Sequence, residues 1–158
     1  PAGARWQLVG VFDRAWVHPL AEAFGNLGSV HTLVVCSEDG LDEISIASDT
    51  HVSELRDGSI RDYVITPEQF GVARQSLASL VVGDAEESCQ MIRSALNGEP
   101  GPASDMVALN AGATIYSADL ADSMETGVER AKAILSSKAG AAKLDELCAY
   151  TQQFTEQD

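Results

Sequence analysis

The sequence predicts an α/β fold in which a mostly parallel sheet carries an antiparallel hairpin and flanking helices. Three observations predict this class. The first half of the chain alternates strand-like and helix-like patterns, an Asp-Gly pair separates two strand-like runs, and the second half shows only helical periodicity. Alternation of strand and helix is typical of βαβ units, whose strands are parallel.

The first strand, the first helix and the second strand are expected before residue 37. Residues 6–12 form a short apolar run, and Asp13 can then cap a helix whose apolar residues recur at spacings of three and four. Gly28 ends this helical pattern, and Pro19 requires the helix either to begin late or to bend. The apolar run 30–36 gives the second strand, so the segment predicts a βαβ unit with two buried parallel strands.

A hairpin and four helices are expected in the rest of the chain. Residues 51–55 and 60–65 are strand-like and flank Arg56-Asp57-Gly58-Ser59, which is a strong hairpin signal. Asp84 can cap the first of the four helices, and the other three follow the breaker at 98–102. The apolar stripes of these helices have the spacing expected of helices that face a core.

The length of the chain is that of one domain, so residues 1–158 are expected to form a single α/β domain. Residues 5–80 are expected to contain the sheet, and residues 84–154 to form a helical part that packs on it. The last residues, 155–158, are expected to be a frayed tail. No apolar run approaches the roughly 20 residues that cross a bilayer, and no signal peptide is recognisable, so a soluble, cytoplasmic protein is expected.

Composition argues against several classes of function. The net charge is −14 and the ten Lys and Arg residues form no cluster, which argues against nucleic acid or a membrane as partner. Cys36, Cys89 and Cys148 are widely spaced, which argues against a disulfide framework or a zinc site and favours buried or half-buried thiols. The three histidines are equally scattered and are expected at the surface or at helix caps.

The chemistry of the chain is expected in the loop Gly40-Leu41-Asp42-Glu43-Ile44, which closely follows the second strand. Open α/β sheets bind ligands beyond the carboxyl ends of their strands, and adjacent carboxylates offer the hard oxygens with which Mg²⁺ bridges a phosphorylated substrate. On spacing alone, a solvated turn is the commoner reason for such a pair in an acidic chain. The motifs of dinucleotide folds, phosphate loops, serine hydrolases, zinc proteases and calcium loops are absent from the sequence.

Segments in a fixed order around this loop carry a resemblance to a known family. They are Pro1-Ala2, Gln7–Phe12, Pro19–Ala23, Leu27-Gly28, Asp39–Ser45, Glu54–Gly58, Thr66–Gly71 and Leu109–Ala113. On these segments the chain resembles the anthranilate phosphoribosyltransferases. In that resemblance Asn110 lies in a helical Leu-Asn-Ala segment, where we expect it to make a helix-packing hydrogen bond rather than to bind a ligand.

The resemblance implies a Mg²⁺-dependent transferase of the glycosyltransferase class. It implies transfer of the phosphoribosyl group of phosphoribosyl pyrophosphate to anthranilate, with release of diphosphate, in tryptophan biosynthesis. It also implies the C-terminal domain of the nucleoside phosphorylase/phosphoribosyltransferase type. Asp42 and Glu43 would inherit the role of metal ligands, with the ion neutralising the departing diphosphate. The full-length protein would be a homodimer.

The chain also departs from the resembled family. The family's glycine-rich diphosphate loop, the Lys and Asn after it and the helix with the anthranilate-contacting Arg are absent from this sequence. Cys36-Ser37 stands where the family often has His-Gly, and Glu38 adds charge beside the loop. We therefore expect a partial domain with an exposed sheet edge, no catalytic residue beyond the metal ligands, and no activity from this chain alone. A pyrimidine nucleoside phosphorylase-like enzyme and a non-catalytic interaction fragment stay open as alternatives.

Overall fold

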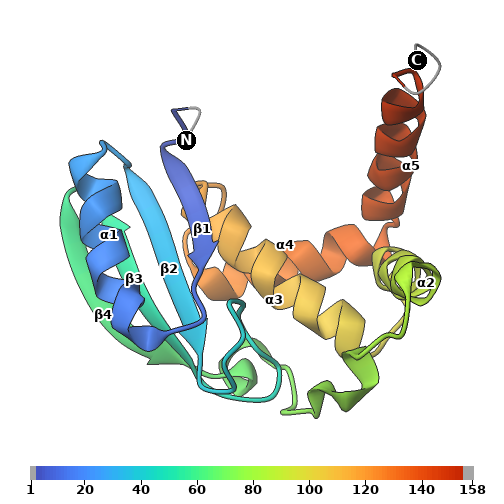
Figure 1. Ribbon diagram of the computed structural model, residues 1–158, viewed down its shortest axis with the longest axis horizontal. Coiled ribbons are helices and arrows are strands. Elements are labelled where there is room, and N and C mark those ends of the chain that lie inside the picture. Colours follow the sequence, from blue (N-terminus) through green and yellow to red (C-terminus); the bar gives the residue numbers. More distant parts are fainter. Residues whose placement is uncertain (1–2, 155–158) are drawn as a thin grey trace.

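A four-stranded sheet forms one side of the molecule and a group of helices forms the other (Figure 1). The computed structural model describes residues 3–154, so the expected tail at 155–158 lies outside the described residues. The strands lie in chain order across the sheet: β1 (Trp6–Gly10), β2 (His31–Ser37), β3 (Thr50–Arg56) and β4 (Ser59–Ile65). β1 and β2 are parallel, whereas β2 with β3 and β3 with β4 are antiparallel.

The predicted α/β class and its hairpin are confirmed, but the sheet is mixed rather than mostly parallel. Only the pairing of β1 with β2 is parallel among the described residues. The reason is the connection 38–49, which contains no crossover helix and returns the chain beside β2 in the opposite direction. The hairpin turns at Asp57 and Gly58, whose φ angles of 49° and 79° suit a two-residue turn.

The helix between β1 and β2 begins late, as Pro19 requires. A short turn, η1 (Arg14–Trp16), precedes helix α1 (Val17–Asn26), and the Asp13 carboxylate accepts a backbone N–H of η1 at 2.9 Å. Pro19 lies in the first turn of α1, where its missing N–H breaks no helical hydrogen bond. Helix α1 covers one face of the sheet and forms a small core there: Val17, Ala21, Val34 and Cys36.

The larger core lies on the other face of the sheet, which helix α3 (Pro102–Ser117) crosses. Its buried members include Leu33, Val35, Ile44, Ile46, Val52, Leu109 and Ala113. Helix α4 (Met124–Ser136) packs closely on α3, because a Cβ on Gly127 would lie only 2.3 Å from the Gly112 carbonyl oxygen. This close contact holds α3 between α4 and the sheet.

Helices α2 (Ala85–Leu96) and α5 (Ala139–Gln152) lie away from the sheet, and α5 projects outward (Figure 1). Asp84 caps α2 as expected, accepting a backbone N–H at 2.9 Å. The prediction that these apolar stripes face a core is wrong for α5, none of whose described residues is buried. Cys89 on α2 is likewise exposed. Helical spacing shows that a helix has an apolar face, but not which segment covers that face.

Short turns link the hairpin to the helices, namely η2 (Pro67–Phe70) and η3 (Leu77–Leu80).

Among the helices of residues 3–154, none has both the length and the apolar character that crossing a membrane requires.

A buried charged network joins the sheet to helix α3. The His31 ring is fully buried, with Nε2 3.0 Å from Glu54 Oε1 and Nδ1 3.1 Å from Asp119 Oδ1. Tyr116 on α3 donates its hydroxyl to Glu54 Oε1 at 2.6 Å, and Arg61 donates to Glu54 Oε2 at 3.0 Å. The expectation of surface histidines is therefore wrong for His31, because its partners lie far along the chain.

The charge of Glu54 is stabilised by this network. Burial alone would raise the pKa of Glu54, but the hydrogen bonds with His31, Tyr116 and Arg61 outweigh burial and lower the pKa from 4.5 to about 2. Because the folded-state pKa lies below the unfolded one, the ionised carboxylate stabilises the fold above pH 4.5, and this contribution is lost as the pH falls towards 2.

We predict that Glu54→Gln lowers the free energy of unfolding by about 3 kcal/mol at pH 7, because it removes the charge that His31 and Arg61 face. The difference between wild type and variant should shrink as the pH is lowered below 4.5. Urea denaturation over a pH series measures both effects. Glu129→Gln, the same change at an exposed site on α4, should alter stability by less than about 0.5 kcal/mol. A difference for Glu54→Gln that is constant with pH would contradict the assignment.

Candidate functional site

A cleft of about 590 Å³ opens at the carboxyl ends of β1 and β2, on the face that α3 covers. Gly10 and Val35, which are neighbours in the β1–β2 pairing, line it from the sheet. Met106 and Asn110 line it from α3, and the Asp42-Glu43 loop closes a third side. Beyond the carboxyl ends of parallel strands is where open α/β sheets bind ligands.

The four acidic residues of the loop have different roles. Asp39 folds the loop on itself, because it accepts hydrogen bonds from the Ser37 hydroxyl and, at 2.5 Å, from the Ser45 hydroxyl. Burial would raise the pKa of Asp39, but these hydrogen bonds lower it below its usual range. Glu38 turns towards His51, whose Nε2 lies 3.5 Å from Glu38 Oε1. Two of the four acids are therefore used within the chain.

Asp42 and Glu43 are the two acids that line the cleft. Both are exposed, and neither carboxylate accepts a hydrogen bond or meets a basic side chain within residues 3–154. Partial burial, and next the charge of Asp42, raise the pKa of Glu43. Two neighbouring carboxylates without a partner are free to bind a cation.

The donor set of the cleft fits Mg²⁺. That ion usually takes one or two protein carboxylates and completes its octahedral shell with water and phosphate oxygens. The described residues contain no group of three or more His, Cys, Asp or Glu side chains arranged to hold a metal. Asp42 and Glu43 therefore suit an ion shared with a phosphorylated ligand better than a closed structural metal site.

Asn110 ties the loop to helix α3. Its side-chain Oδ1 accepts the Ile44 N–H at 2.9 Å, and its Nδ2 donates to the Ile44 carbonyl at 3.0 Å. The same Nδ2 donates to the Met106 carbonyl within the helix at 3.0 Å. The expected helix-packing hydrogen bond is thus present. Because Asn110 bonds the backbone of Ile44, directly after Glu43, the Asn110 side chain also sets the position of the Asp42-Glu43 carboxylates.

Gly10, the last residue of β1, positions the loop of the candidate site, a role that the sequence analysis missed. A Cβ placed on Gly10 would lie 1.5 Å from the Asp42 carbonyl oxygen. Only glycine therefore allows the loop to lie against the end of β1. A glycine at the end of a strand-like run is a known signal of close backbone approach, and that signal could have identified it.

Comparison with known proteins identifies the family. A family model described as "Glycosyl transferase family, a/b domain" matches residues 1–143. The chain belongs to this glycosyl transferase family.

Curated relatives are highly similar to this chain but much longer. The anthranilate phosphoribosyltransferase of Methylococcus capsulatus is 53% identical over 154 residues, which are 98% of this chain and 45% of the relative. That of Thioalkalivibrio sulfidiphilus is 51% identical over 151 residues, which are 96% of this chain and 45% of the relative. The chain therefore spans less than half the length of these relatives.

Solved structures of anthranilate phosphoribosyltransferases have a similar fold. The anthranilate phosphoribosyltransferase of Thermus thermophilus aligns with a TM-score of 0.82 at 38% identity, covering 90% of this chain and 42% of that one. The Saccharomyces cerevisiae enzyme, described as in complex with PRPP and Mg, aligns with a TM-score of 0.76 at 20% identity. The alignment covers 88% of this chain and 41% of that one. The second likeness is one of fold alone. Together with the family match, the first confirms the predicted resemblance and the phosphoribosyltransferase-type α/β class.

We predict that Gly10→Ala displaces the Asp42-Glu43 loop, because the added methyl group overlaps the Asp42 carbonyl. Overpacking against rigid backbone should cost about 1–3 kcal/mol of unfolding free energy, measured by urea denaturation. The matched control is Gly83→Ala, whose Cβ would meet only the flexible carboxylate of Glu87 at 3.3 Å. Equal stability losses in the two variants would show that the loop does not depend on Gly10.

Proposed function

We propose that this chain forms the C-terminal part of an anthranilate phosphoribosyltransferase. The reaction would transfer the phosphoribosyl group of phosphoribosyl pyrophosphate to anthranilate and release diphosphate, within tryptophan biosynthesis. The relatives that bear this name, at about half identity, favour it over a nucleoside phosphorylase. Structures of the yeast enzyme are described with PRPP and Mg and with 4-fluoroanthranilate, which supports the same substrates and metal here.

The observation that carries the proposal is a pair of carboxylates, Asp42 and Glu43, that lie in a cleft at the strand ends and have no partner among the described residues. Loss of diphosphate develops negative charge on the leaving group, and a Mg²⁺ ion held there would neutralise that charge. The carboxylates fix the ion and leave its other positions for phosphate oxygens and water.

The chain's other cleft residues position the carboxylates and shape the site. Asn110 and Gly10 hold the loop at the strand ends, as the geometry above shows. Leu8 and Met106 give the cleft an apolar wall, which limits access of water to a bound ligand on that side. These residues orient and shield; none of them is placed to transfer a proton.

β1, which lines the cleft, is an edge strand of the sheet among the described residues. We propose that a segment equivalent to the N-terminal half of the relatives completes the cleft, and that residues 1–158 alone, as one partial domain, have no transferase activity. Assembly as a homodimer and a cytoplasmic location remain predictions from the resemblance.

The metal assignment predicts a specific change in metal dependence. In a protein that includes a segment equivalent to the relatives' N-terminal half, Asp42→Asn combined with Glu43→Gln should depress turnover far more at limiting Mg²⁺ than at saturating Mg²⁺. Loss of both ligands should raise the half-saturating Mg²⁺ concentration by at least about 100-fold. Removing a residue that only supports a metal ligand already weakens metal affinity by up to about 100-fold, and removing the ligands themselves should cost no less. Loss of anthranilate fluorescence during phosphoribosyl transfer, followed over a Mg²⁺ titration, measures this.

Glu38→Gln is the matched control for this experiment, because it makes the same change in the same loop on a side chain that faces His51. It should leave the Mg²⁺ dependence close to that of wild type. Unchanged metal dependence in the Asp42/Glu43 variant would remove the ligand assignment.

A further inference from the structure

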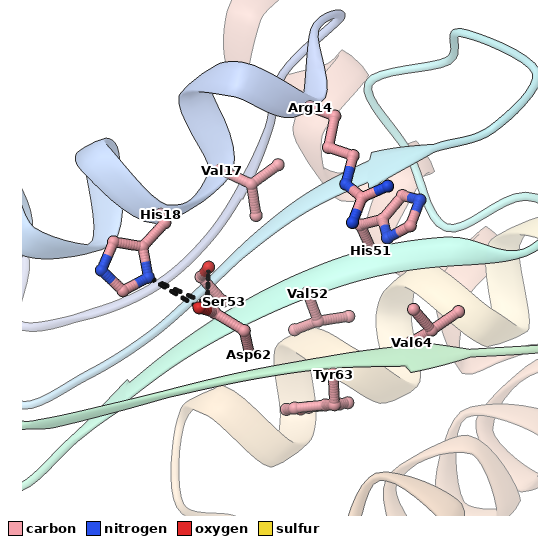
Figure 2. Close-up of a pocket in the computed structure, with 9 residues that line it drawn as sticks. All are labelled: Arg14, Val17, His18, His51, Val52, Ser53, Asp62, Tyr63 and Val64. Atoms are coloured by element: carbon pink, nitrogen blue, oxygen red, sulfur yellow. Dashed lines mark hydrogen bonds and ion pairs between the residues drawn. The ribbon is translucent and has the colours of Figure 1, made fainter.

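A second cleft, of about 370 Å³, lies on the opposite face of the sheet from α3. It forms where η1 and α1 pass beside β3 and β4 (Figure 2). His51 and Ser53 of β3 and Asp62 of β4 line it from the sheet, and Arg14 and His18 line it from the helical side. The proposed transfer reaction makes no use of these residues.

One end of this second cleft is cationic. Arg14 and His51 both line the cleft, and in the view of Figure 2 both are drawn away from the His18–Asp62 pair. Within residues 3–154 the Arg14 side chain has no hydrogen bond and no ion pair, and the His51 ring contacts an acid only through Glu38, at 3.5 Å. Four other arginines are paired with carboxylates: Arg56, Arg61, Arg74 and Arg93. The N–H donors of Arg14 are therefore available to a ligand.

The other end of the second cleft holds an oriented carboxylate. His18 Nδ1 lies 2.8 Å from Asp62 Oδ2, and the Ser53 hydroxyl donates to Asp62 Oδ1. Since the acid stands between the histidine and the serine, the histidine cannot activate the hydroxyl, which excludes a catalytic triad. A carboxylate has about four acceptor positions, so Asp62 can still accept a hydrogen bond from a ligand hydroxyl.

We propose that this cleft binds a small hydroxylated oxyanion, with its phosphate or carboxylate on Arg14 and His51 and a hydroxyl on Asp62. A guanidinium with free donors recognises either oxyanion through paired, charge-assisted hydrogen bonds. The volume lies at the lower end of the range of about 300–1,000 Å³ for small-molecule sites. With a net charge of −14 the chain repels anions in general, so binding depends on this local cationic end.

Isothermal titration calorimetry of the intact protein tests the proposal, in buffer with EDTA and without phosphate or carboxylates. The probes are glycerol 3-phosphate, glycerate and glycerol. Glycerol 3-phosphate or glycerate should bind at one site per chain, and glycerol should not bind. The tighter of the two anions identifies the head group. Arg14→Gln should weaken that binding by about tenfold or more, the cost of a hydrogen bond to a charged group.

Three further variants locate the site. Arg5→Gln removes the same charge from an arginine outside the cleft and should leave affinity unchanged. Asp42→Asn with Glu43→Gln should also leave it unchanged, which separates this site from the cleft on the other face. Asp62→Asn should weaken the binding of glycerol 3-phosphate more than the binding of inorganic phosphate, because only the former carries the hydroxyl that Asp62 would accept. The proposal is overturned if neither anion binds, or if Arg14→Gln and Arg5→Gln have equal effects.

Discussion

Two hydrogen bonds between the Asn110 amide and the backbone of Ile44 fix the geometry on which the proposed activity depends. They join helix α3 to the loop that follows β2, and so set where the Asp42 and Glu43 carboxylates lie. The helix itself is held by its close packing on α4 and by the core beneath it. Gly10 completes the arrangement, because it lets the loop rest on the end of β1.

The charges of the chain are distributed so that each face of the sheet offers a different chemistry. Glu54 and Asp39 are acids that the fold itself uses, since each accepts hydrogen bonds from nearby side chains. Asp42 and Glu43 have no such partners among the described residues, which leaves them for a cation. Within residues 3–154, Arg14 is similarly unpaired on the opposite face. Partnering, rather than the number of charges, therefore separates Glu54 and Asp39 from the groups left for a ligand: Asp42, Glu43 and Arg14.

The sequence predicted local features well, since those depend on neighbours along the chain. The Asp13 and Asp84 caps, the turn at Asp57 and the βαβ unit all follow from short-range patterns. Prediction from the sequence failed where a residue's contacts lie far away along the chain. The burial of His31 depends on residues 23 and 88 positions distant, and nothing local shows that β3 returns antiparallel. The resemblance singled out the Asp42-Glu43 pair, but its anchor on α3 required the structure.

The central claim is that an anchored loop presents a Mg²⁺ site, and the Mg²⁺ affinity of Asn110→Ala tests it most directly. Calorimetric titration in the presence of diphosphate should show affinity weakened by about 10-fold or more relative to wild type, because the carboxylates lose their fixed position. Asn26→Ala makes the same change at an exposed position of α1, outside this cleft, and should bind as wild type does. Wild-type affinity in a folded Asn110→Ala protein would contradict the account.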